Sequence, residues 1–120
     1  MIPAMADDKI ETIVSSSSGT LGRARNEARG VAVPFDSSSR PQPDAFTNSE
    51  AFLGSVSSCG VTLVEMHARE TGVPLERMRV TIEGRRPPTQ ARFSAVTMTF
   101  EMAGVSQAQA EALVETYRQR

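Results

Sequence analysis

The sequence predicts an α+β fold in which helices pack against one face of an antiparallel sheet. Residues 51–64 contain no charged side chain and their apolar residues recur at helical spacing, which indicates a long central helix buried on all sides. Residues 78–83 and 96–102 alternate apolar and polar side chains, the period of half-buried strands. The resulting element order, β-β-β-α-β-β-α, is typical of the α+β class.

The N-terminal third predicts three strands and a loop. Apolar residues within 9–16 precede a serine-rich turn, so we expect a strand there. Residues 20–29 are polar, and a strand there would be exposed. Residues 31–35 are a better strand, which Pro34 places at a strand end or at a sheet edge. Residues 36–46 are rich in serine and proline and predict a long surface loop, of a kind that is often functional.

A capping box predicts where the central helix begins. Thr47 and Glu50 have the T-x-x-E spacing, which places Thr47 at the N-cap. The helix should end at Gly72, because glycine tolerates the left-handed backbone of a helix end. The uncharged segment is shorter than the roughly 20 residues that cross a bilayer, so we expect the core helix of a soluble protein.

The C-terminal third predicts a hairpin and a final helix. The two alternating segments should form an antiparallel pair joined by residues 84–88, which are rich in glycine, arginine and proline. Phe93 and Ala95 have the opposite parity to the second strand, so we expect a bulge or a register change near Ala95. Ser106 and Gln109 form a second capping box, which predicts the start of the last helix.

Length and composition describe one ordinary globular domain. We expect residues 1–8 to be a flexible N-terminus and residues 9–120 to form a single domain. The net charge of -1 gives no field that would attract nucleic acid or acidic lipid. No membrane span or secretion signal is visible, and the one cysteine fits a reducing compartment, so we expect a cytoplasmic protein.

The start of the central helix carries the most specific pattern. Glu50 is followed by small residues and then by the pair Ser58-Cys59. This pattern resembles the OsmC/Ohr family of small thiol-dependent hydroperoxide reductases. The similar stretches are residues 48–59, 72–73, 78–84, 93–100 and 104–106, so that the resemblance covers roughly residues 9–120 as one OsmC-like domain.

The resemblance implies an OsmC-like intertwined homodimer that buries two long helices against each other and has its active sites at the subunit interface. It also implies that a cysteine on the central helix reduces small organic hydroperoxides, that an arginine and a glutamate hold its thiolate ready, and that a second cysteine resolves the sulfenic acid. We expect no cofactor, because no cofactor motif is visible. We expect no metal, because His67 and Glu70 lack a second set of ligands.

The resemblance assigns three site residues. Cys59 matches the peroxidatic cysteine, and Glu50 matches the glutamate, although Glu50 lies nine positions before Cys59, where Ohr-type members tend to have an offset of ten. The arginine should come from the first two strands, where Arg23 and Arg25 are both available, and we favour Arg23. The family's Cys-Pro pair follows a helix like residues 115–120 and is missing here. Either the full protein continues beyond this point or no internal disulfide forms.

Helix geometry constrains how these residues act. Nine residues of helix rise about 13.5 Å and end half a turn out of phase, so Glu50 and Cys59 face opposite sides. If both belong to one site, Glu50 comes from the partner subunit. An ordinary thiol has a pKa of about 8.5 and must be ionised to attack a peroxide. Cys59 lies too far from the helix N-terminus for the helix dipole to act, so an arginine must supply the charge.

Two functions remain open. In the first, Cys59 reduces an organic hydroperoxide, and an external dithiol restores it. Apolar neighbours such as Phe52 and Leu63 would then favour fatty or aromatic hydroperoxides. In the second, Cys59 is inert, and a non-catalytic OsmC-like dimer binds a small hydrophobic ligand at its interface. The missing second cysteine favours the second function, and the Glu50–Cys59 segment favours the first.

Overall fold

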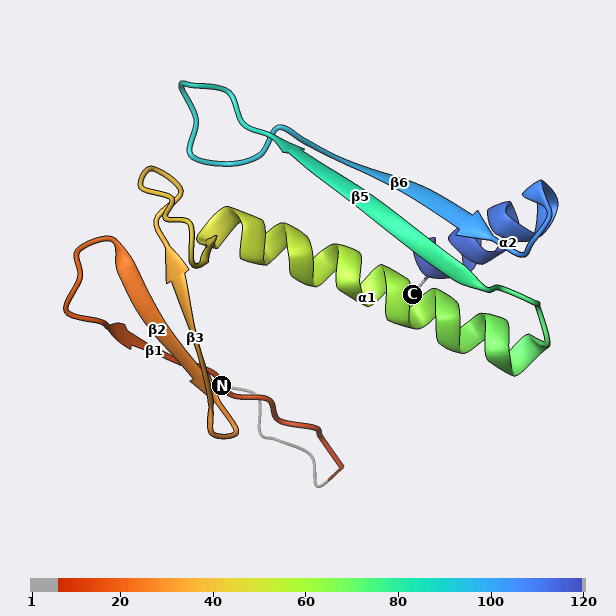
Figure 1. The fold of residues 1–120 in the computed structure, drawn as a ribbon, viewed down its shortest axis with the longest axis horizontal. Helices are drawn as coiled ribbons and strands as arrows, with labels where there is room; N and C mark the ends of the chain where they lie inside the picture. Colours follow the sequence, from red (N-terminus) through yellow and green to blue (C-terminus); the bar gives the residue numbers. More distant parts are fainter. Residues whose placement is uncertain (1–6, 120) are drawn as a thin grey trace. The chain divides into compact units, whose positions relative to one another are not determined.

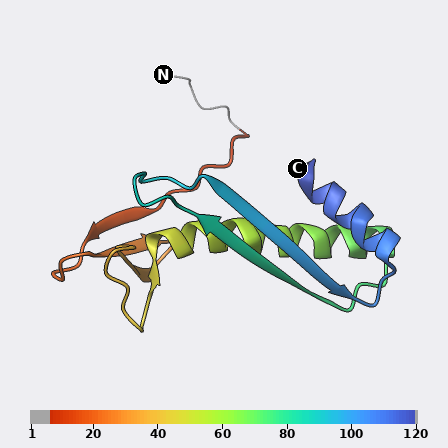
Figure 2. The same ribbon diagram turned by 90° about the horizontal axis from the view of Figure 1, so that it is seen from above.

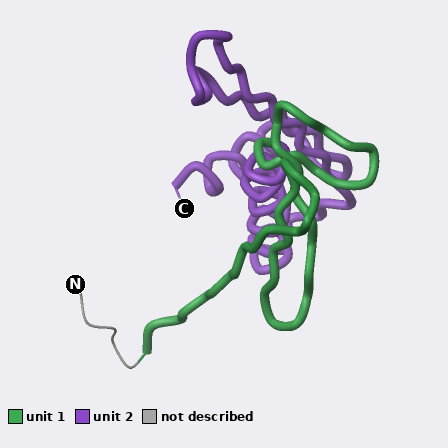
Figure 3. Tube along the Cα trace, turned by 90° about the vertical axis from the view of Figure 1, so that its left-hand side faces the viewer, with its two compact units in different colours: residues 1–49 green, residues 50–120 purple. Residues whose placement is uncertain are grey.

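The computed structural model describes residues 7–119 and has the α+β fold that the sequence predicts. The chain divides into two compact units, Met1–Ser49 and Glu50–Arg120, each with its own sheet (Figures 1 and 3). The single domain expected over residues 9–120 stays a prediction. Of the N-terminal segment 1–8 that we expected to be flexible, residues 1–6 lie outside the described residues. Within residues 7–119, no helix is both long enough and apolar enough to cross a membrane.

Unit 1 is a four-stranded sheet in the order β1-β2-β3-β4. Its strands are β1 (Val14–Ser17), β2 (Arg23–Ala28), β3 (Val31–Asp36) and β4 (Phe46–Thr47). The first three are antiparallel, and β4 adds a short parallel pair to the end of β3. Arg29 and Gly30 join β2 to β3 with φ values of 53° and 81°, as a two-residue hairpin turn requires. Pro34 precedes the pairing with β4, on an otherwise open edge, as expected.

The first strand lies further along the chain than we predicted. We expected it over residues 9–16, followed by a serine-rich turn, but Ser15, Ser16 and Ser17 are in β1. The hydroxyl of Ser15 ties the strand to its neighbour, because it donates to the Asn26 side chain at 2.6 Å. Asn26 in turn donates to the Val33 carbonyl at 3.0 Å, so one buried amide joins three strands. The exposed strand expected over residues 20–29 is therefore the inner strand β2.

Unit 1 has no apolar core among its described residues. Its buried side chains are Asn26, Asp36 and Thr47, all polar. Apolar side chains on its strands are exposed instead, including Val31 at 54% and Phe46 at 64%. Burial of apolar surface is the main force that drives folding, so polar contacts carry an unusual share of the stability of this unit.

Unit 2 holds the apolar core. Its elements are α1 (Asn48–Thr71), which begins just before the unit boundary, β5 (Arg77–Arg85), β6 (Ala95–Ala103) and α2 (Gln107–Arg118). The β5–β6 hairpin runs along α1 in both views, with α2 near the second half of the helix (Figures 1 and 2). Val64 and Ala68 of α1 are buried with Leu113 of α2, and half-buried residues of the hairpin pack around them. At Gly60 the Tyr117 ring comes so close that a Cβ would lie 3.4 Å from it.

The predicted helix ends are confirmed. α1 begins directly after Thr47 and ends before Gly72, which has φ 72°, while the Val73 N–H donates to the Ala68 carbonyl at 2.9 Å. At the start of α2, the Ser106 hydroxyl accepts from the Gln109 N–H at 3.2 Å, and the Gln109 side chain accepts from the Ser106 N–H at 3.0 Å.

One prediction about unit 2 is wrong, and the all-round burial of α1 stays a prediction. The single chain buries α1 on one side, because the hairpin and α2 both pack against the face of Gly60, Val64 and Ala68, so burial of the opposite side depends on the expected partner subunit. The hairpin has neither the bulge nor the register change expected near Ala95, since its register runs without a break to the pair Arg85↔Ala95. Phe93 has the opposite parity because it precedes β6 and is not part of the strand. Its ring packs over Gly84, where a Cβ would lie only 2.5 Å from it.

An arginine between two aspartates lies at the centre of the polar contacts of unit 1. Arg23 of β2 binds Asp36, its cross-strand partner in β3, through Nε at 2.7 Å and Nη2 at 3.1 Å. It also binds Asp44 of the loop through Nη2 at 2.5 Å and Nη1 at 3.1 Å. These hydrogen bonds from Arg23 hold the pKa of both carboxyl groups below its ordinary value, and the two anions raise the pKa of the guanidinium.

These shifts predict a loss of stability in acid. Because the folded-state pKa of Asp36 is lowered from 3.8, its contribution is complete above that pH and is lost as the pH falls through the lower folded-state value. Urea denaturation at pH 7 and at pH 3 should show a larger loss for the wild type than for Asp36→Asn, which cannot titrate at this position. Equal losses in the two proteins would contradict this assignment.

Candidate functional site

Cys59 lies halfway along α1, on the side of the helix that the core leaves uncovered. The exposed positions on this side recur at intervals of three and four residues, and we call them the Cys59 stripe. The stripe consists of Phe52, Ser55, Cys59, Thr62 and Met66. None of its members is charged, and the two large apolar ones are well exposed, Phe52 at 58% and Met66 at 60%. The thiol is thus accessible within an uncharged surface.

The sulfur of Cys59 has no hydrogen-bond or ion-pair partner within the described part of unit 2, where its residue is a free, exposed cysteine. The hydrogen bond that Cys59 accepts from the Thr62 hydroxyl, at 3.2 Å, goes to its backbone carbonyl and does not involve the sulfur. Aromatic rings lie at the N-terminal end of the stripe. Phe52 stacks on Phe93 at 6.5 Å between ring centres, and the Arg86 guanidinium lies 5.0 Å from the centre of the Phe93 ring.

Glu50 and Cys59 are not brought together within one chain. Both side chains are exposed, and α1 is unbroken between them. Nine residues of continuous helix separate them by about 13.5 Å of rise and half a turn. Glu50 therefore lies on the side of α1 that carries Val64 and Ala68, and the geometric prediction from the sequence holds.

The two candidate arginines belong to unit 1 and differ in their surroundings. Arg23 is only 20% exposed and uses four N–H donors, from Nε, Nη1 and twice from Nη2, on two carboxylates. Arg25 makes one ion pair with Glu27, and these two side chains are 53% and 43% exposed. Because four directed bonds fix a side chain far better than one exposed pair does, Arg23 is the ordered arginine of the two.

Sequence reasoning missed the two carboxylates that hold Arg23. Asp36 was findable in principle, because the turn at Arg29 and Gly30 fixes the register that places Asp36 opposite Arg23. Asp44 lies in the serine- and proline-rich loop, and no periodic signal points to its partner. That loop therefore does have a specific role, as its length suggested, since one of its side chains binds Arg23.

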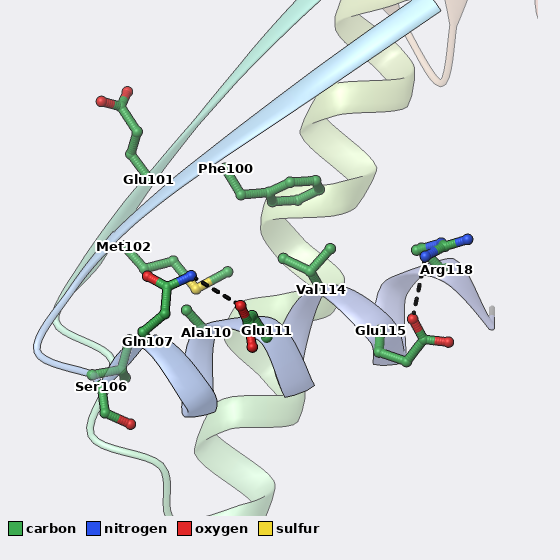
Figure 4. Close-up of a pocket in the computed structure, with 11 residues that line it drawn as sticks. Phe100, Glu101, Met102, Ser106, Gln107, Ala110, Glu111, Val114, Glu115 and Arg118 are labelled. Atoms are coloured by element: carbon green, nitrogen blue, oxygen red, sulfur yellow. Dashed lines mark hydrogen bonds and ion pairs between the residues drawn. The ribbon is translucent and has the colours of Figure 1, made fainter.

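A metal site and an open groove were the other candidates for a functional site. Residues 7–119 contain no group of three or more His, Cys, Asp or Glu side chains able to hold a metal ion. An open groove of about 570 Å³ lies between β6 and α2 (Figure 4). Its Glu111 accepts from Gln107, its Glu115 is paired with Arg118, and none of the three predicted site residues lines it.

Solved structures of low sequence identity share this fold. An OsmC-like protein from Mycoplasma pneumoniae is 16% identical, with a TM-score of 0.79 over 94% of this chain and 83% of the other. The organic hydroperoxide resistance protein OsmC from Legionella pneumophila is 19% identical, with a TM-score of 0.70 over 93% and 85%. The organic hydroperoxide resistance protein OhrB of Bacillus subtilis is 14% identical, with a TM-score of 0.62 over 92% and 84%.

At these identities the neighbours establish the fold. No curated protein matches the sequence. The family described as OsmC-like protein matches residues 41–120, which include the whole of α1 and everything that follows it. Because this match covers well over half of the chain and contains the Ser58-Cys59 pair, the protein belongs to the OsmC-like family.

Proposed function

We propose that this protein reduces organic hydroperoxides with Cys59 and so protects the cell against oxidative stress. The observation that carries the proposal is the place of Cys59, an accessible thiol at the centre of an uncharged helix stripe. Membership of the OsmC-like family supports it, as does the likeness to structures named organic hydroperoxide resistance proteins. The cytoplasm, where thiols are kept reduced, is the compartment that suits this chemistry.

The reaction proceeds by attack of the Cys59 thiolate on the outer oxygen of the hydroperoxide. The O–O bond breaks, the sulfur becomes a sulfenic acid, and the leaving alkoxide takes up a proton to become the alcohol. An external dithiol then attacks the sulfenic sulfur, releases water and forms a mixed disulfide, which its second thiol resolves to restore Cys59. The uncharged stripe favours the apolar part of a fatty or aromatic hydroperoxide over hydrogen peroxide.

The thiolate needs a positive charge, and we assign that role to Arg23. Its four directed hydrogen bonds make it the better ordered of the two candidate arginines. Glu50 is the third site residue, and it acts on the Cys59 of the partner subunit, because half a turn of helix separates it from its own. No cofactor or metal ion takes part in this scheme.

We further propose that the Cys59 stripe packs against a second copy of this chain. Spacings of three and four residues along a helix form a seam that a second helix can cover. The stripe carries no charge from Phe52 to Met66, so two copies can meet without repulsion. Unit 1 has no apolar core of its own, and a second subunit would also supply cover for its exposed valines. The site would then lie at the subunit interface.

Peroxide consumption tests the redox role. With excess dithiol at pH 7, the wild type should consume cumene hydroperoxide at least about a hundredfold faster than Cys59→Ser, because the substitution removes the nucleophile. Thr62→Ser, which removes a methyl group from the same stripe and keeps the hydroxyl, is the matched control and should retain the wild-type rate. Equal slow consumption by the wild type and Cys59→Ser would leave the second candidate, a non-catalytic dimer that binds a small hydrophobic ligand.

A charge on the stripe tests the dimer. Met66→Lys should convert a dimer into a monomer in sedimentation velocity, because a buried unpaired ammonium costs several kcal/mol. Glu65→Lys places the same side chain one residue away, on an exposed position off the stripe, and should leave the dimer intact. A monomeric wild type, or a dimer that survives Met66→Lys, would refute the stripe as the interface.

A further inference from the structure

Arg23 is surrounded by more negative charge than it can neutralise. Two carboxylates share one guanidinium, and four of its five N–H donors are already used. Such a cluster has a net charge of -1 and would oppose the formation of a thiolate rather than favour it. If Arg23 is to hold a thiolate, as the proposed function requires, one of the two carboxylates must give up its place.

The two aspartates differ in every property that decides which of them leaves. The Asp36 side chain is 2% exposed, comes from a paired strand and binds the Nε side of the guanidinium. The Asp44 side chain is 67% exposed, comes from the loop and binds the outer edge formed by Nη1 and Nη2. Release of Asp44 into water costs little, whereas an unpaired Asp36 would remain buried.

The cavity around Arg23 offers Asp44 a second partner. An open pocket of about 530 Å³ is lined by Arg23, Asp36 and Asp44, and also by Arg40 of the same loop. The Arg40 side chain lies beside Gly22, where a Cβ would be 3.4 Å from its Cδ. Arg40 is therefore a second cation on the wall of the pocket that Asp44 also lines, so the charge of Asp44 keeps a cation in its surroundings when it leaves Arg23.

We propose that Asp36 is the positioning residue that aims Arg23, and that Asp44 occupies the outer edge of the guanidinium in place of the thiolate and is displaced when the site is active. This inference rests on the proposed pairing of Arg23 with Cys59 and deepens it. Asp36 fixes the direction of the guanidinium through two parallel hydrogen bonds, and Asp44 sets how much of its positive charge is available.

The test is the pH profile of Cys59 alkylation by iodoacetamide in the full-length protein. Asp44→Asn should raise the rate at pH 6 about tenfold, because it removes a carboxylate that competes for the cation. Asp36→Asn should lower that rate about tenfold, because Arg23 loses the bonds that aim it. The two substitutions remove the same charge, so opposite effects are the signature of positioning. Glu27→Gln, which frees Arg25 on the same strand, should leave the profile unchanged.

Alkylation rates test the roles of Asp36 and Asp44, and peroxide turnover tests the redox function separately. No effect of Asp44→Asn, a shift in the same direction from both aspartate variants, or a shift from Glu27→Gln alone would overturn the inference. Should Asp36→Asn fail to fold, Asp44→Asn decides by itself, since its side chain is exposed. Alkylation reports the thiolate whether or not peroxide is reduced. Opposite shifts without peroxide turnover would therefore support the inference and refute the function, and turnover without shifts would do the reverse.

Discussion

Within one chain, α1 is packed on one side only, and this arrangement determines the surroundings of Cys59. The face of Gly60, Val64 and Ala68 is covered by the hairpin and α2, so the opposite face, with Cys59 at its centre, stays exposed except where Phe93 stacks on Phe52. A helix that lacks charge on both faces is normally buried on both. Accessibility of the thiol and the need for a second covering surface thus have the same origin, which is why catalysis and assembly are proposed at the same place.

The ion pairs formed by Arg23 lie in unit 1. Unit 1 buries polar side chains in place of an apolar core, and its best ordered cation is held by two carboxylates. With both carboxylates bound, Arg23 stabilises the loop but has little positive charge left to stabilise a thiolate. The two roles of Arg23 therefore conflict as long as both carboxylates stay. The conflict disappears if the exposed carboxylate is exchangeable, because the buried one alone keeps the guanidinium ordered.

Local signals in the sequence were sufficient for most of the fold. Capping residues gave the starts of both helices, Gly72 gave the end of the first, and alternation gave the hairpin, because each of these depends on residues close together in the chain. The errors arose where distant residues decide. Ser15 is held in a strand by its hydrogen bond to the buried Asn26. Phe93 packs over Gly84, although its parity suggested a bulge. The same holds for the site, since the resemblance pointed to Cys59, Glu50 and Arg23, whereas the partners of Arg23 depend on register and on a loop.

Peroxide is proposed to oxidise the sulfur of Cys59, and trapping of the sulfenic acid tests this step. The reduced protein is treated at pH 7 with less than one equivalent of cumene hydroperoxide in the presence of a dione that traps sulfenic acids, and its peptides are analysed by mass spectrometry. The trapped adduct is expected on Cys59, together with an equal amount of cumyl alcohol. An unmodified Cys59 beside unconsumed hydroperoxide would contradict it and leave only the fold.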